Sequence, residues 1–441
     1  MIFNQWISMA RSRETLSQRV VGSYAVLLHG SQIGRIHHSG DFSEFEFTAQ
    51  YLQNPNRPVL GLWFEEHLNE SCASALLLPP WFSNLLPEGP LRQWIAEDRG
   101  VSAEREMELL AQVGHDLPGA VQVVAAEEVE TSSNIEAISV MRPVSPAPGV
   151  ESAWRFSLAG VALKFSMLEV SDRLTIPAAG EHGDWLVKFP DYRYPNAPVN
   201  EFLMMRMAGE IGIDTPEVRL IHRDELPRQL PKRMWPGSEQ FAYAVRRFDR
   251  KPDRSRRMVH VEDFAQVLNR WTEPTRHTQD KYRSKFETVA GIAYRGRDLN
   301  SLAETVRRIS FNAVIGNGDA HLKNWALIYP DGRNPKLSPV YDLVSTIAYQ
   351  PPDEVPDFGL KLAGSKRFDQ IRADSFVRLQ RTLQDRFGAI NLDLSQIARD
   401  TASRVSLAWT EVQEQYSELA ELSPKIDTWI EDASARLATA A

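Results

Sequence analysis

The stretch "GNGDAHLKNWALIYPDG", Gly316 to Gly332, gathers several chemically active side chains into one short segment. Asp319 precedes Asn324 by five residues, with His321 and Lys323 between them. An apolar, strand-like run and a Pro-Asp-Gly turn follow at once, which is typical of a hairpin. The Asp–Asn pair alone is also typical of a polar turn, because Asp and Asn form local hydrogen bonds there. Other segments of the sequence are needed to distinguish a polar turn from a catalytic and metal-binding site.

A second acidic residue, Asp342, lies eighteen residues after Asn324. Between the two, "WALIY", the turn "PDGRNP" and "KLSPVYD" predict a hairpin that folds back and returns Asp342 close to Asn324. A carboxylate and an amide are oxygen ligands that Mg²⁺ takes together with phosphate oxygens and water. Asp319 would then orient an attacking hydroxyl, and the protein-kinase catalytic loop has the same Asp-to-Asn spacing. The pattern favours phosphoryl transfer.

Segments before this loop occur in the order of a kinase fold. "RFSLAGVALKFSM" (Arg155–Met167) is typical of two strands joined by a flap whose backbone amides can cover phosphates. "DWLVKFP" places Lys188 in a strand, where a lysine is often only a solubilising edge residue but in a kinase contacts phosphates. Glu201, on the helix predicted next, could pair with it. "QFAYAVRRFDR" predicts an alternating strand at the position of a hinge. Together these signals predict a kinase-like phosphotransferase.

Length and composition limit the architecture. A chain of 441 residues with 43% hydrophobic and 24% charged residues is expected to form two or three globular domains. Its net charge of −8 argues against a surface that grips nucleic acid throughout. The single cysteine, Cys72, excludes an internal disulfide, and no signal peptide or long apolar run occurs. We therefore expect a cytoplasmic protein.

Periodicity divides the chain into three parts. Residues 23–64 alternate like an antiparallel meander, and helical patterns follow from Pro80. We predict an α+β, protein-kinase-like two-lobed fold with an extra N-terminal β-rich subdomain and a mostly helical C-terminal lobe. The predicted boundaries are 1–140 for the subdomain, 141–255 for the lobe with phosphate loop and hinge, and 256–441 for the helical lobe with the catalytic loop.

Two other features have simpler explanations. "HRDELPRQL" (His222–Leu230) spells the His-Arg-Asp of a kinase catalytic loop, but Gln229 stands five residues after Asp224, where Asn is needed. We expect a surface turn there. The tract 219–257 is rich in Lys and Arg, which favours a solvated basic face over a surface for nucleic acid or an acidic partner.

The chain resembles the HipA family of serine/threonine kinase toxins. The resemblance covers nearly the whole chain and is carried by "FSNLLPEGPLRQWIA" (Phe82–Ala96), "RFSLAGVALKFSM", "WLVKFP", "VNEFLMMRMAGEIGI", "RRFDR" (Arg246–Arg250), "HVEDFAQVL" (His260–Leu268), "NGDAHLKNWAL" and "SPVYDLVST". It implies that Asp319 is the catalytic aspartate, that Asn324 and Asp342 hold Mg²⁺, and that Ser157 is the loop serine that becomes autophosphorylated. The nucleotide-binding residues that it implies are Ala159, Gly160, Val161, Ala162, Leu163, Lys164, Lys188, Arg246, Arg247, Phe248, His321, Lys323, Asn324, Tyr341 and Asp342.

Two positions differ from the family pattern: Ala162 stands where the loop often has Gln, and Arg246 where the hinge often has Glu. Main-chain contacts are still expected at both. The resemblance implies ATP and Mg²⁺ as cofactors, an aminoacyl-tRNA synthetase as the class of protein substrate, and a small helix-turn-helix antitoxin as partner. Contact with DNA would then be mainly through the antitoxin, and no membrane is involved. Two alternatives stay open: a small-molecule kinase of the aminoglycoside or choline type, and a non-catalytic corepressor that bridges a DNA-bound antitoxin.

Overall fold

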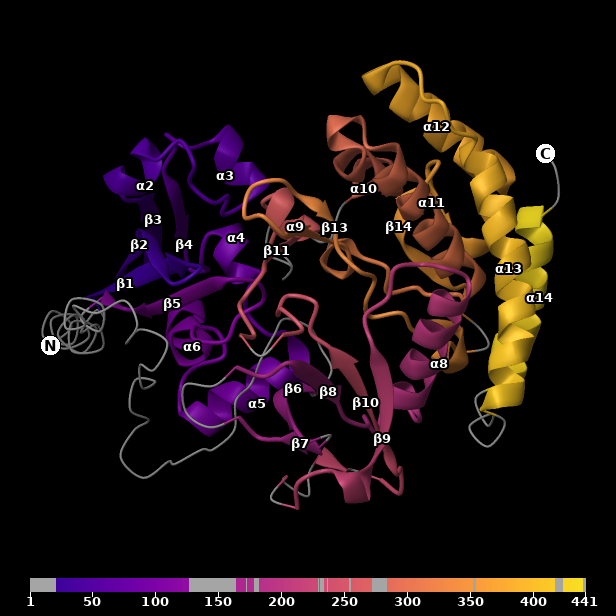
Figure 1. The fold of residues 1–441 in the computed structure, drawn as a ribbon, viewed down its shortest axis with the longest axis horizontal. Coiled ribbons are helices and arrows are strands. Elements are labelled where there is room, and N and C mark those ends of the chain that lie inside the picture. The colour runs from indigo at the N-terminus through magenta and orange to yellow at the C-terminus, as the bar shows by residue number, and fades with distance from the viewer. Residues whose placement is uncertain are drawn as a thin grey trace, which may run out of the picture.

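A computed structural model provides the three-dimensional structure (Figure 1). It describes residues 21–126, 164–171, 173–177, 182–228, 230, 234–235, 237–253, 255–271, 284–351, 354–416 and 423–438. Ser157, the flap residues 159–163 and the predicted boundary between residues 140 and 141 lie outside these ranges. In the described part of the chain, every helix is too short or too polar to cross a membrane.

The N-terminal part is built on an antiparallel five-stranded sheet in the order β4-β3-β2-β1-β5. Its strands are β1 Val21–Leu28, β2 Ser31–Ser39, β3 Phe42–Phe47, β4 Cys72–Ala75 and β5 Val121–Ala125. The predicted meander is confirmed, since β1 to β4 pair in sequence. The helices here are α2 Ala49–Gln53, α3 Leu62–Glu66, α4 Pro80–Ser83, α5 Gly89–Arg99 and α6 Glu106–Val113. Helix α5 ends at a glycine, Gly100, in the left-handed conformation that glycine adopts without strain.

A second antiparallel sheet has the order β7-β6-β8-β10-β9. Its strands are β6 Lys164–Val170, β7 Arg173–Thr175, β8 Trp185–Lys188, β9 Val218–His222 and β10 Phe241–Arg246. The predicted lysine strand, the helix after it (α8, Ala197–Glu210) and the hinge strand are all present. The His-Arg-Asp sequence forms an exposed 3₁₀ turn, η2 Arg223–Glu225, as expected of a surface turn.

The remainder is mostly helical, as predicted. It contains β11 His260–Asp263, α9 Phe264–Val267, α10 Phe286–Ala293, η4 Arg295–Arg297, α11 Leu299–Val314, η5 Leu322–Asn324, β12 Ala326–Tyr329, β13 Lys336–Leu337, η6 Thr346–Tyr349, β14 Asp357–Leu362, β15 Ser365–Arg367, η7 Phe368–Gln370, α12 Ala373–Phe387, α13 Leu394–Gln415 and α14 Ser423–Ala438. The predicted hairpin is β12–β13, and β11 adds a third strand to it. Helices α12 to α14 form the outer edge of this part in Figure 1.

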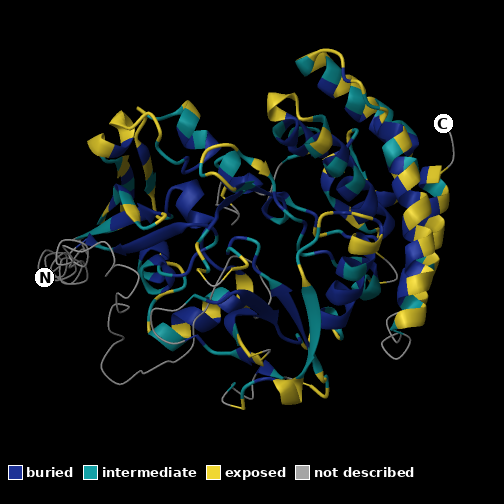
Figure 2. Cartoon of the chain, viewed as in Figure 1, coloured by how far each residue is buried: buried dark blue, intermediate teal, exposed yellow. Residues whose placement is uncertain are grey.

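The two faces of the second sheet contribute to different hydrophobic cores. Its strands β6, β8 and β10 are mostly buried, whereas β9 is half-buried along its length (Figure 2). On β8, Trp185 and Val187 pack into the core shared with the N-terminal part, while Leu186 packs into the core shared with α8 and the C-terminal helices. This follows from the two-residue period of a strand. Lys188 has the parity of Leu186, so its side chain belongs to the α8 face.

Candidate active site

The loop that carries Asp319 is held by hydrogen bonds on both sides. The Asn317 amide oxygen accepts a hydrogen bond from the Asp319 N–H at 3.0 Å, and the Asn317 amide nitrogen donates to Asn312 at 2.7 Å. Gly318 N–H donates to the Thr346 hydroxyl at 2.8 Å. Gly316 has φ +66°, and a Cβ there would lie 2.1 Å from Ile347, so this position requires glycine. Specific hydrogen bonds and a required glycine therefore fix the conformation of this loop, which is more than a polar turn.

Within the loop, the Asp–Asn spacing has a direct structural result. The Asn324 amide nitrogen donates to the Asp319 carbonyl at 2.7 Å, closing the loop on itself. His321 Nε2 lies 3.3 Å from an Asp319 carboxylate oxygen, and the Asp319 side chain is 67% exposed. This exposure leaves the Asp319 carboxylate accessible to a hydroxyl from a second molecule.

The hairpin brings the end of the segment 325–342 back to the loop. The Tyr341 hydroxyl donates to the Lys323 carbonyl at 2.7 Å, and Asn324 and Asp342 line the same pocket. Asp342 has φ +55°, an uncommon conformation for a residue other than glycine, which occurs where surrounding contacts enforce it.

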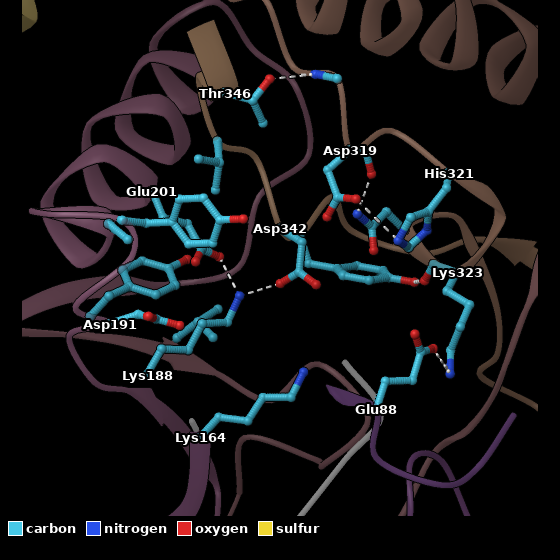
Figure 3. Close-up of a pocket in the computed structure, with 18 of the residues that line it drawn as sticks. Glu88, Lys164, Lys188, Asp191, Glu201, Asp319, His321, Lys323, Asp342 and Thr346 are labelled. Carbon is cyan, nitrogen blue, oxygen red and sulfur yellow. Dashed lines mark hydrogen bonds and ion pairs between the residues drawn. The ribbon is translucent and has the colours of Figure 1, made fainter. Parts of the chain in front are cut away.

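Lys188 joins two carboxylates (Figure 3). Its ammonium lies 2.6 Å from Glu201 and also contacts Asp342. Burial lowers the pKa of Lys188, but the charges of Asp342 and Glu201 outweigh burial and raise it above its usual value. Burial raises the pKa of Asp342, but Lys188 and Lys164 oppose it and bring it to about 2. Burial together with the charge of Asp342 raises the pKa of Glu201 to about 7 despite the proximity of Lys188. At neutral pH the pair Lys188–Asp342 is ionised.

Lys164 is a second buried cation of the site. It is the first residue of β6 and lies opposite Lys188 in the pairing of β6 with β8. Only 4% of its surface is exposed. Burial lowers its pKa to about 8; the charge of Asp342 opposes this shift and that of Lys188 adds to it. Two lysines therefore converge on one side of Asp342, an arrangement suited to phosphate groups.

One pocket of about 800 Å³ contains all of these groups. Every predicted site residue that the structure describes lines it, namely Lys164, Lys188, Arg246, Arg247, Phe248, Asp319, His321, Lys323, Asn324, Tyr341 and Asp342. The volume is in the range of pockets that bind cofactors and drug-sized ligands. Ser157, Ala159, Gly160, Val161, Ala162 and Leu163 lie outside the described residues, so their roles stay predictions.

The three predicted hinge residues face different surroundings. Arg246 pairs with Glu217 at 3.3 Å on the partly exposed side of the sheet. Arg247 is buried and pairs with Asp116 at 3.0 Å and with Asp249 at 2.9 Å. The side chain of Arg247 thus links the hinge to the N-terminal part. Phe248 lies with its ring centroid 5.7 Å from that of Tyr341, which places two aromatic rings at the pocket.

Sequence reasoning missed the contribution of the N-terminal part to the pocket. Lys323 Nζ lies 2.8 Å from Glu88 and donates to the Asn84 carbonyl at 3.1 Å. These contacts favour a role for Lys323 in orienting the loop over direct contact with phosphate. Glu88 stands in "FSNLLPEG", which carried part of the family resemblance, but no spacing rule connects it with Lys323. The pair depends on tertiary packing across 235 residues of sequence, since Glu88 and Lys323 are that far apart.

Comparisons with known proteins identify the family of this chain. The family model "HipA-like C-terminal domain" matches residues 156–409, and "HipA N-terminal domain" matches residues 24–124. The Sinorhizobium fredii protein named "Putative kinase Y4dM" is 38% identical over 399 residues, which cover 87% of this chain and 90% of that protein. The "Serine/threonine-protein kinase toxin HipA" of Shewanella oneidensis is 26% identical over 302 residues, 60% of this chain and 63% of the toxin.

A solved structure shares the fold. It is that of the Shewanella oneidensis MR-1 toxin–antitoxin system HipA, HipB and operator DNA complex, with a TM-score of 0.65 and 20% identity. The match covers 95% of this chain and 100% of that one. It confirms the predicted α+β, kinase-like fold. From the two family models and the identity to Y4dM together, the chain belongs to the HipA family of kinases.

Proposed function

We propose that this chain is an ATP- and Mg²⁺-dependent serine/threonine protein kinase that serves as the toxin of a toxin–antitoxin module. One observation carries the proposal: Lys188 is paired with both Glu201 and Asp342 inside the pocket that also holds Asp319 and Asn324. A kinase needs this combination, since a lysine must reach phosphates while separate oxygen ligands and a separate carboxylate act beside it.

The residues of the pocket fit both cofactors. Asn324 uses its amide nitrogen for the Asp319 carbonyl, so its amide oxygen is the atom suited to a cation. With the Asp342 carboxylate it would supply the two hard oxygen donors that Mg²⁺ accepts beside phosphate oxygens. When bound, the ion neutralises negative charge on the transferred phosphoryl group. Phe248 and Tyr341 would contact the adenine base, and Lys164 and Lys188 the phosphates.

In the proposed transfer of the γ-phosphoryl group, side chains of the pocket have the following roles. Asp319 orients the serine or threonine hydroxyl of the substrate and accepts its proton as the oxygen attacks the γ-phosphorus. The bond between the γ-phosphorus and the β,γ-bridging oxygen breaks in the same step, and ADP leaves with that oxygen. His321, 3.3 Å from the Asp319 carboxylate, holds that carboxylate in place. Lys188 and Lys164, which are both buried, keep the phosphates fixed and stabilise their charge, because electrostatic interactions are stronger away from water.

The proposed biological role is based on the comparison with HipA. Because the Shewanella HipA structure contains HipB and operator DNA, we propose a small helix-turn-helix antitoxin as partner here, with DNA contact mainly through the antitoxin. The basic tract supports this, because Arg219 and Arg246 pair with glutamates and Arg247 with buried aspartates, which leaves less positive charge for DNA. We further propose an aminoacyl-tRNA synthetase as protein substrate and autophosphorylation at Ser157.

Incubation with labelled ATP and Mg²⁺ tests the proposal. Intact-mass and peptide mass spectrometry of the wild type should show added phosphate, absent in Asp319→Ala. If Ser157 is the acceptor, Ser157→Ala removes the label from this chain but preserves transfer to a protein substrate. Phosphorylation of a free amino-alcohol in place of protein would instead identify a small-molecule kinase. Toxicity that survives Asp319→Ala would favour the non-catalytic corepressor.

A further inference from the structure

Helix α8 carries Glu201 and is enclosed by the protein on most sides. Ten of its residues are buried: Pro198, Val199, Asn200, Glu201, Phe202, Leu203, Met204, Met205, Met207 and Ala208. It lies between the second sheet and α13 (Figure 1). The Phe202 ring meets the Tyr416 ring edge to face, with centroids 5.2 Å apart. Most of the buried side chains are apolar, and Asn200, with no exposed surface, is a polar exception.

The Asn200 carboxamide makes hydrogen bonds through both its nitrogen and its oxygen to one segment, residues 345–349. Its nitrogen donates to the Ser345 carbonyl at 3.0 Å and to the Tyr349 hydroxyl at 3.3 Å. Its oxygen accepts from the Ser345 N–H at 2.9 Å. Such a two-way bond with a backbone fixes both position and orientation, and in a buried place its loss leaves polar groups unpaired. Helix α8 is thus fastened to the segment three residues after Asp342.

The next residue fastens the same segment to the catalytic loop. The Thr346 hydroxyl accepts from the Gly318 N–H at 2.8 Å and donates to the Gly316 carbonyl at 2.9 Å. The Thr346 N–H donates to the Gly316 carbonyl as well, at 3.2 Å. Gly318 directly precedes Asp319. The dipeptide Ser345–Thr346 therefore connects α8 on one side with the loop on the other.

We propose that Asn200 is a positioning residue for phosphoryl transfer. Through Ser345–Thr346 it fixes the positions of Glu201, Asp342 and Asp319 relative to one another. The inference rests on the proposed function. Asn200 contacts neither cofactor nor substrate in this account; it acts through the groups that do. A misplacement of about 1 Å in such a constellation costs about 10²-fold in rate, so one amide on a buried helix can control the step.

The test compares Asn200→Ala and Asn200→Asp with a control on the same helix. Met207→Ala removes a fully buried side chain two helical turns from Asn200 but leaves the amide in place. We expect both Asn200 variants to lose about 10- to 100-fold in kcat and to need more Mg²⁺ for half-maximal rate, because Asp342 is displaced. Nucleotide affinity without Mg²⁺ should be unchanged. Met207→Ala should lower Tm and leave kcat and the Mg²⁺ requirement unchanged.

Thr346→Val tests the other half of the connection without removing volume. We expect it to lower kcat, and the double variant Asn200→Ala/Thr346→Val to lose less than the product of the two single losses. If Asn200→Ala does not fold, the kcat and Mg²⁺ requirement of Asn200→Asp and Thr346→Val test the inference instead. Wild-type kcat and Mg²⁺ requirement in these variants would overturn the inference. Hydrogen exchange at the Ser345 amide tests the role of Asn200 separately from the proposed function. Faster exchange in Asn200→Ala is expected even if the wild type transfers no phosphate.

Discussion

The Lys188 ammonium lies 2.6 Å from a Glu201 carboxylate oxygen and contacts Asp342, which is 154 residues away in the sequence. One nearly buried cation thus joins a strand of the second sheet, the helix behind it and the segment that leaves the β12–β13 hairpin. Because each partner comes from a different element, the ion pairs report on the relative placement of all three. They also keep charged groups inside the protein, which is tolerated only while the pairing is complete.

Replacement of Lys188 should therefore affect both folding and binding. Lys188→Met leaves Glu201 and Asp342 without their shared cation, and removal of one member of a buried pair costs about 3–5 kcal/mol. We expect a loss of that size in the free energy of unfolding, measured by urea denaturation, together with loss of ATP binding in calorimetry. Lys366→Met, in an exposed pair with Asp357, should cost about 1 kcal/mol or less. Equal effects of the two changes would contradict the account.

The pKa of about 8 for Lys164 predicts that nucleotide affinity depends on pH. The charged ammonium binds phosphate, and its population falls as pH rises through 8, so the Kd for ATP should increase above that pH, by up to about tenfold per pH unit. Lys188, whose pKa is raised, stays charged across this range. Titration calorimetry between pH 7 and 9.5 measures the profile. Lys164→Arg should flatten it, because Arg stays charged; an unchanged slope in that variant would rule Lys164 out as its source.

Arg246 and Arg247 are adjacent in sequence but should differ in importance for stability. Arg247→Met removes a cation that Asp116 and Asp249 share in a buried network, at a cost of about 3–5 kcal/mol. Arg246→Met breaks a partly exposed pair with Glu217 and should cost about 1 kcal/mol or less. Thermal unfolding of both variants checks this. A larger drop in Tm for Arg246→Met would show that the link between hinge and N-terminal part is not the stabilising one.

Much of the fold follows from local sequence patterns. The alternation in residues 23–64 predicts the first meander, and the alternation in "QFAYAVRRFDR" predicts β10, because strands repeat every two residues. The Pro-Asp-Gly turn predicts the β12–β13 hairpin, since the turn chemistry and both strands lie within one short segment. These features depend on neighbours in sequence, and the structure confirms them.

Other features depend on contacts that no local pattern encodes. The Lys323–Glu88 pair, the Arg247–Asp116 pair and the pairing of β11 with β12 each form only when distant segments pack together. The pairing of Lys188 with Glu201 is predicted from the order of kinase-like elements, and the structure confirms it. Arg247 shows the limit most clearly: the sequence places it at the hinge, but only the fold shows that its side chain is directed to Asp116.

The most direct test of the central claim compares two aspartates that a sequence pattern alone could confuse. Asp319 lies in the pocket, whereas Asp224, in the His-Arg-Asp sequence, lies on an exposed turn. The measurement is the rate of phosphoryl transfer from ATP at saturating Mg²⁺ for wild type, Asp319→Asn and Asp224→Asn. We expect a loss of about 10²–10⁴-fold for Asp319→Asn, as is typical of an acid–base group, and a wild-type rate for Asp224→Asn. Undiminished transfer by Asp319→Asn would contradict the central claim.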